Sequence, residues 1–125
     1  MNTLLRILVA LPAILFLVLG LRWAVDPAGA AAELGMPLLE GLGRSSQIGD
    51  VGSFFLSAGI MILLALLTGR SSWFQAPALM LVLVAVLRIV AWLFHDAALA
   101  VEPILVEVVV AALLLVASSR LQRDS

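Results

Sequence analysis

Cysteine is absent from this chain, and histidine occurs once, at His95. Without cysteine there is no disulfide, thiolate nucleophile, iron–sulfur ligation or thiol-based zinc site. A single histidine gives no metal-ligand spacing, and the chain has neither a Gly-x-Ser-x-Gly elbow nor a glycine loop that cradles phosphate before a helix. These absences predict no metal and argue against hydrolases and nucleotide enzymes. Whether the chain catalyses any reaction stays open, and a noncatalytic role is favoured.

Charged residues are scarce as well. They make up 12% of the chain, none of them is lysine, and the formal net charge is -1. A nucleic-acid-binding protein needs a basic face to hold phosphates. Nucleic acid is therefore excluded as an expected partner.

Apolar residues account for 64% of the 125 residues, well above the roughly 45 to 50% of soluble domains. They form four long runs, at residues 4–25, 48–68, 73–94 and 99–118. Each run has about the 20 residues that a helix needs to cross the hydrocarbon of a bilayer. An open strand would leave backbone groups unpaired in lipid, and the runs lack the alternation of a barrel. The sequence predicts one all-α domain over residues 1–125, an integral membrane four-helix up-and-down bundle.

The connections between these runs differ in length. Residues 69–72 and 95–98 form short turns, whereas residues 26–47 form a long first loop. We read Asp26-Pro27 and Met36-Pro37 as breakers in this loop, and we expect a short interfacial helical turn at residues 37–40.

Arginine is unevenly distributed about the spans. Arg6, Arg70, Arg120 and Arg123 share one side, against Arg22 and Arg44 on the other. Because positive charge is retained on the cytoplasmic side, this count predicts that both termini are cytoplasmic and that the long loop and His95 face outward. Trp23 and Trp92 would then lie at the outer membrane interface and Trp73 at the inner one.

The third run contains an arginine, Arg88, well inside its apolar stretch. Arg88 precedes His95 by seven residues, roughly 10 Å along a helix. Arg88, Trp92 and His95 follow the spacing i, i+4, i+7, which places them on one face of one helix. Charge inside a membrane usually pairs, lines water or marks a functional path.

The second run begins with Gln47 and Asp50. Asp50 starts a stripe that continues through Phe54, Ser57 and Met61. Gly49, Ser53 and Ser57 recur every four residues, the spacing of small residues at close helix contacts in membranes. We expect these three small residues to pack against another helix.

The fourth run supplies a partner for Arg88. Glu102-Pro103 is typical of a helix start, and Glu107 lies five residues further, at a depth close to that of Arg88. An arginine fork can hold one carboxylate through two parallel hydrogen bonds, and Asp50 could take the remaining donors. Two acids against one arginine leave a negative charge, which protonated His95, a bound cation or a shared proton would offset. Alternatively, this cluster is only a clamp that fixes helix register.

The first loop and its flanks carry a family resemblance. The segments Leu19-Gly-Leu-Arg-Trp, Asp26-Pro-Ala-Gly-Ala-Ala-Ala and Leu34-Gly-Met-Pro-Leu resemble the first loop of DoxX-like bacterial membrane proteins, and residues 63–70 are also similar. The resemblance covers about the first three-quarters of the chain and points to an uncharacterised four-helix branch. It implies a multi-pass protein of the bacterial inner membrane. Some relatives are associated with quinone-linked sulfur oxidation or with oxidative-stress complexes, but no catalytic motif carries over.

The leading hypothesis from the sequence is an outward-facing polar pocket that binds a small amphiphile, a quinone or a lipid head group. No cofactor other than such a quinone is expected. One alternative is a noncatalytic subunit bound to partner helices in a membrane redox complex, and another is proton-coupled transport. The residues expected to bind the amphiphile are Gln47, Asp50, Arg88, Trp92, His95 and Glu107.

Overall fold

The computed structural model describes residues 1–124, which are helical throughout apart from short connections and contain no strand. Four helices in this part of the chain are long and apolar enough to cross a membrane, as the sequence predicts. Glu102 and Pro103 lie in the first turn of the last helix, also as predicted. The elements are α1 (Thr3–Val25), α2 (Pro27–Glu33), α3 (Gly41–Ser46), the π-helical turn η1 (Gln47–Val51), α4 (Gly52–Thr68), α5 (Ser72–Phe94) and α6 (Val101–Asp124).

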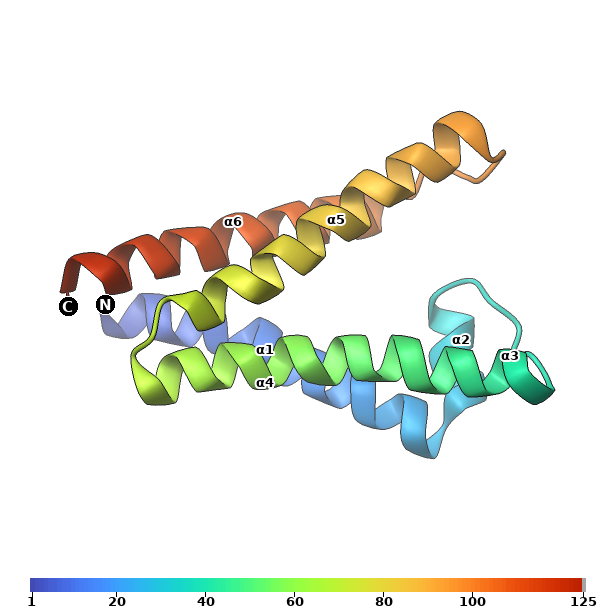
Figure 1. Cartoon of the computed structure of the whole chain (residues 1–125), viewed down its shortest axis with the longest axis horizontal. Helices are drawn as coiled ribbons and strands as arrows, with labels where there is room; N and C mark the ends of the chain where they lie inside the picture. Colours follow the sequence, from blue (N-terminus) through green and yellow to red (C-terminus); the bar gives the residue numbers. More distant parts are fainter. Residues whose placement is uncertain (125) are drawn as a thin grey trace.

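The long helices form two antiparallel pairs (Figure 1). One pair is α1 with α4, continued by η1 and α3, and the other is α5 with α6. The pairs meet at the end that holds both termini and the turn at Gly69, which we call the closed end. They diverge toward the opposite end, the open end, where α2, α3 and the turn after α5 lie (Figure 1). We call the two diverging pairs the arms: the first arm is α1 with α4, η1 and α3, and the second arm is α5 with α6.

The shared core lies toward the closed end. Its buried residues come from all four long helices, and small and large side chains alternate in it. They are Val9, Ala13, Phe16, Ala58, Ile62, Ala65, Phe74, Ala78, Leu81, Ala111, Leu114 and Ala117. In a membrane, such contacts stabilise mainly through close packing, because lipid tails are as apolar as the side chains themselves.

Polar contacts also form at the closed end, one between the arms and two within the α5–α6 arm. The amino group of Met1 forms an ion pair with Asp124, which places the two termini side by side (Figure 1). Gln75 Nε2 donates to Ser118 Oγ at 3.0 Å, and Ser118 Oγ donates to the carbonyl oxygen of Ser71 at 3.2 Å. These contacts tie the start of α5 to the last turns of α6.

Glycines allow α1 and α4 to approach closely. A Cβ added at Gly59 would lie 2.8 Å from Leu17 Cγ and 2.9 Å from the carbonyl oxygen of Ala13, and one at Gly20 would lie 2.5 Å from Leu56 Cγ. The expected contact through Gly49, Ser53 and Ser57 was wrong, because all of them are exposed. The four-residue spacing is present in the sequence, but α4 turns a different face toward α1.

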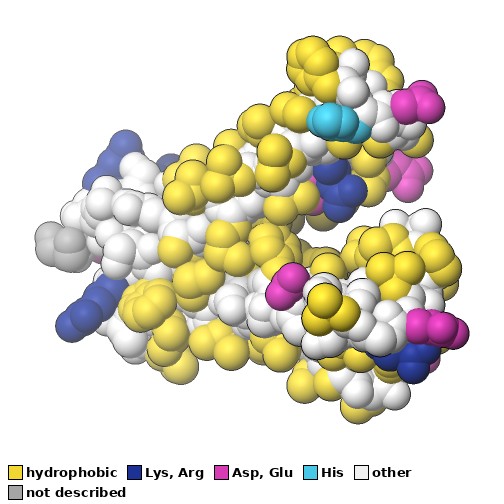
Figure 2. All heavy atoms as spheres, turned by 45° about the vertical axis from the view of Figure 1, so that its right-hand side comes forward, with side chains coloured by type: hydrophobic (Ala, Val, Ile, Leu, Met, Phe, Trp, Pro, Cys, Tyr) yellow, Lys and Arg dark blue, Asp and Glu magenta, His cyan; other side chains and the backbone are white. Residues whose placement is uncertain are grey.

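Large apolar side chains cover much of the outer surface. Leu11, Leu67, Leu87 and Val109, one on each long helix, are all more than half exposed. Figure 2 shows hydrophobic side chains along both arms on the visible face. A surface this apolar on all long helices suits contact with lipid.

The first loop contains helices where the sequence indicated breakers. Asp26 caps α2, its side chain accepting from the backbone N–H of Gly29 at 3.2 Å, and Pro27 occupies the first helical position. Aspartate followed by proline is a helix start of this kind. The helical turn expected at residues 37–40 was wrong, because this segment has no regular secondary structure. The Trp23 side chain is buried against Ala30 and Ala31 of α2, so the indole is not presented to the membrane interface.

Candidate functional site

Arg88 of α5 and Glu107 of α6 form an ion pair, which confirms the predicted partnership. Arg88 Nε donates to both carboxylate oxygens, at 3.1 Å to Oε1 and 3.0 Å to Oε2. The Glu107 side chain is 11% exposed and the Arg88 side chain 33%. The geometry differs from the expected fork, because a single nitrogen makes both contacts. The carboxylate is held while most of the guanidinium stays available.

The position of this pair follows from the α5–α6 contact. Leu81 and Ala85 are buried on the face of α5 that leads to Arg88, one helical turn at a time. On α6, Ala111 and Leu114 are buried on the face that leads back to Glu107. The ion pair therefore continues an apolar seam into the region where the arms separate.

The terminal amino groups of Arg88 make no hydrogen bond with any described residue. Within residues 1–124, no buried side-chain nitrogen or oxygen lacks a partner. The unpaired terminal amino groups are therefore at the accessible surface. A guanidinium has five N–H donors, and four of them belong to these two groups.

Asp50 lies on the other arm at a matching level. It stands nineteen residues before Gly69, and Arg88 stands nineteen residues after it. At about 1.5 Å per residue, both residues are roughly 28 Å from the turn on antiparallel helices. In this structure the Asp50 side chain is exposed and forms no ion pair with Arg88. The expectation that Asp50 takes the remaining donors of Arg88 is not met, because the arms have separated at this level.

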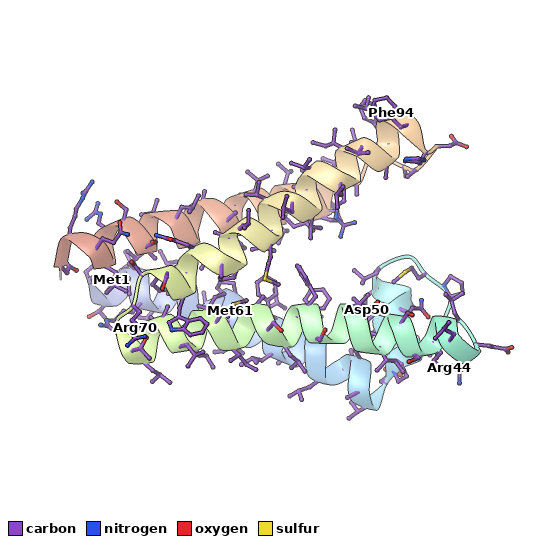
Figure 3. The ribbon with its side chains drawn as sticks, in the orientation of Figure 1. Met1, Arg44, Asp50, Met61, Arg70 and Phe94 are labelled. Carbon is purple, nitrogen blue, oxygen red and sulfur yellow. The ribbon has the colours of Figure 1, made fainter. Side chains whose placement is uncertain are left out.

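The surface is hollowed between the arms. Figure 2 shows this gap at the open end, with basic and acidic side chains along it. Figure 3 labels Asp50 on the stretch of helix that runs beside the gap and Met61 nearer the closed end, on the same helix. Phe54, between them in the stripe, is half-buried and packs against the shared core. One wall of the gap thus carries a carboxylate above apolar side chains.

Gln47 has a different environment from the other predicted site residues. It is buried, its Oε1 accepts from the backbone N–H of Leu39 at 2.8 Å, and its Nε2 donates to the carbonyl oxygen of Pro37 at 3.1 Å. These two bonds hold the residues before α3 in an irregular conformation. Gln47 therefore anchors the loop to the first turn of η1.

Trp92 and His95 lie at the tip of the second arm. Trp92 is 46% exposed, one helical turn beyond Arg88. His95 ends α5, its backbone N–H donating to the carbonyl oxygen of Ala91 at 3.0 Å, and its side chain is exposed. Asp96 follows with a φ of 55°, a left-handed conformation that reverses the chain toward α6. His95 forms no ion pair with another described residue.

An apolar groove that sequence reasoning missed runs along α5 and α6. It has a volume of about 330 Å³ and is lined entirely by aliphatic side chains, among them Val82, Ile89, Ile104, Val108 and Leu115. Ile89 and Val108 directly follow Arg88 and Glu107 in the sequence, so the groove begins at the level of the ion pair. In the sequence its lining residues look like any other lipid-facing positions. No sequence signal therefore distinguishes the groove from the rest of the lipid-facing surface.

A second charged cluster joins α1 to α2. Arg22 forms ion pairs with Glu33 and, at 3.5 Å, with Asp26. All three side chains are at least one-third exposed, so each contact stabilises by less than about 1 kcal/mol. Neither this cluster nor any other part of residues 1–124 has three or more histidine or acidic side chains placed to hold a metal.

The fold and site define a multi-pass helical membrane protein with a partly exposed ion pair between the two helices of its α5–α6 arm. Comparisons of the chain with family models, with curated proteins and with solved structures gave no match. The resemblance to DoxX-like proteins stays a prediction from the residues that carry it.

Proposed function

We propose that this protein binds a small amphiphile between its two arms, with the polar head at Arg88 and Asp50. The observation that carries the proposal is that, among residues 1–124, the terminal amino groups of Arg88 have no hydrogen-bond partner and Asp50, at the same level of the opposite arm, has no ion-pair partner. A guanidinium at this depth is costly unless its donors are satisfied. A quinone carbonyl or a lipid head group supplies the acceptors it requires.

Each predicted site residue has a distinct role in this proposal. Glu107 orients Arg88 through Nε and leaves the terminal amino groups free to bind. Gln47 shapes the loop beside the first turn of η1 rather than touching the amphiphile. Trp92 flanks the head, and His95 lies at the tip of the same arm. Asp50 accepts a hydrogen bond from the opposite side.

We place the protein in the bacterial inner membrane, with the closed end in the cytoplasm. The closed end carries Arg6, Arg70, Arg120 and Arg123. Positive charge on one side favours its retention in the cytoplasm. The resemblance to DoxX-like proteins supports this location and keeps a quinone among the candidate ligands.

The proposal is tested by identifying small molecules that copurify with the detergent-extracted protein. Wild type is compared with Arg88→Gln and with Arg70→Gln, which removes an exposed arginine at the closed end. We expect a compound that is retained by wild type and Arg70→Gln and lost from Arg88→Gln. Equal amounts of the same bulk lipid in all samples would contradict the proposal.

A second candidate function is that of a noncatalytic subunit. The apolar groove on α5 and α6 is a surface on which a partner helix could pack. In that case the Arg88–Glu107 pair serves only to fix the α5–α6 register. Purification in mild detergent with a stoichiometric membrane partner, lost on Val86→Trp in the groove, would favour this function.

A further inference from the structure

Resting on the proposed function, we propose that the amphiphile is a zwitterionic aminophospholipid of the phosphatidylethanolamine class. Its phosphate accepts hydrogen bonds from the terminal amino groups of Arg88, and its ammonium group donates to the carboxylate of Asp50. The head group thereby bridges the two arms.

The first argument is the division of donors and acceptors across the gap. The α5 wall presents N–H donors, because Arg88 engages Glu107 through Nε alone. The opposite wall presents an acceptor from η1, because the exposed Asp50 side chain has no hydrogen bond or ion pair with the other described residues. The occupant must therefore carry an acceptor on one side and a donor on the other. The carbonyl groups of a quinone satisfy only the first requirement.

The second argument is charge. Arg88, Glu107 and Asp50 together sum to one negative charge, and Asp96 lies near the tip of the α5–α6 arm. His95 at the tip adds positive charge only when it is protonated. An anionic lipid would bring further negative charge to these carboxylates. A zwitterion adds none and places its own cation beside Asp50.

The third argument is the shape and lining of the gap. The hollow lies at the open end (Figure 2), and long apolar helices flank it. Phe54 and Met61 are half-buried below Asp50 on one stripe of the first arm. Arg88 stands sixteen residues from the start of α5, roughly 24 Å of helix. Acyl chains thus have apolar surface beneath the head while they remain in the bilayer.

The test is a titration of the delipidated full chain in detergent, followed by native mass spectrometry. The probes are phosphatidylethanolamine, phosphatidylcholine and phosphatidylglycerol with identical acyl chains, together with a short-chain ubiquinone analogue. Phosphatidylcholine keeps the phosphate and the positive charge but has no N–H donor. The variants are Asp50→Ala, Arg88→Gln and, as a control, Glu102→Gln, which changes an exposed acid near the tip of the second arm.

We expect wild type and Glu102→Gln to bind phosphatidylethanolamine about tenfold more tightly than phosphatidylcholine, as one charge-assisted hydrogen bond implies. Asp50→Ala should lose this preference, because no acceptor remains for the ammonium group. Since the Asp50 side chain is exposed and has no side-chain partner among residues 1–124, the variant should still fold. Arg88→Gln should weaken binding of both lipids.

Equal binding of all three phospholipids to wild type, or a preference for phosphatidylglycerol, would overturn the lipid assignment. If the ubiquinone analogue then bound in an Arg88-dependent way, the proposed function would stand and only the assignment would fail. If no probe bound in an Arg88-dependent way, both would fail.

Discussion

Arg88 holds both carboxylate oxygens of Glu107 through a single nitrogen, Nε, at 3.1 and 3.0 Å. This arrangement satisfies the acid and leaves the two terminal amino groups of the arginine without a hydrogen-bond partner among residues 1–124. A clamp built only for stability would favour the bidentate fork, which uses more of the donors. The geometry therefore favours a role in binding over a purely structural one.

The ion pair should nevertheless contribute to stability. Arg88→Leu leaves Glu107 buried without its cation, and we expect a loss of about 3 kcal/mol in the free energy of unfolding. The double variant Arg88→Leu with Glu107→Leu should recover most of this loss, because no unpaired charge remains. Thermal unfolding in detergent measures both variants. A double variant as unstable as the single one would show that apolar contacts cannot replace the pair.

The contact between α1 and α4 predicts opposite effects at two glycines. Gly59→Ala places a methyl group within 3 Å of α1 and should destabilise the fold by about 1 to 3 kcal/mol. Gly49→Ala meets nothing within 4 Å, and it should be neutral or stabilising by up to about 1 kcal/mol. Both variants are compared by denaturation in the same detergent. Equal destabilisation by the two substitutions would argue against this helix packing.

Gln47 should control the order of the first loop. Gln47→Ala removes a buried amide that bonds the backbone at Pro37 and Leu39, at a cost of about 1 to 3 kcal/mol. Hydrogen exchange at residues 36–40 should accelerate. Gln75→Ala, which removes a hydrogen bond at the closed end, is the control and should leave exchange in this loop unchanged. Unchanged exchange in Gln47→Ala would mean that other contacts order the loop.

Asp26 should stabilise α2 mainly as a helix cap. Asp26→Asn keeps a capping oxygen and loses the exposed ion pair with Arg22, so we expect a change below about 1 kcal/mol. Asp26→Ala loses both and should destabilise α2 by about 1 kcal/mol more. Hydrogen exchange over residues 27–33 separates the two variants. If Asp26→Asn and Asp26→Ala changed the exchange of α2 equally, the ion pair with Arg22 rather than the helix cap would account for the stability that Asp26 contributes.

The parts of the structure that follow from local rules could be predicted from the sequence. Hydropathy gives the four spans, because each needs only length and composition. The Arg88–Glu107 pair follows from counting residues inward from one short turn, which fixes depth on two adjacent helices. Asp50 and Arg88 are likewise equally far from Gly69 in the sequence. This spacing predicts that they lie at the same distance from the closed end, one on each arm.

The relations that depend on packing could not be predicted in this way. The separation of Asp50 from Arg88 reflects the angle between the arms, which the buried side chains at the closed end set together. Repeated small residues do not reveal which face of α4 meets α1. For this reason the sequence did not identify Gly59 as a residue of the contact with α1. The partners of Gln47 are backbone groups in a loop, and hydropathy carries no information about them.

The most direct test of amphiphile binding between the arms is photolabelling with a phospholipid analogue that carries a photoreactive group near its head, followed by peptide mapping. We predict that labels concentrate at residues 50–61 and 84–95 and fall sharply in Arg88→Gln but not in Arg70→Gln. Labels spread evenly over the lipid-facing surface of α1 and α6, and unchanged by Arg88→Gln, would contradict the binding site.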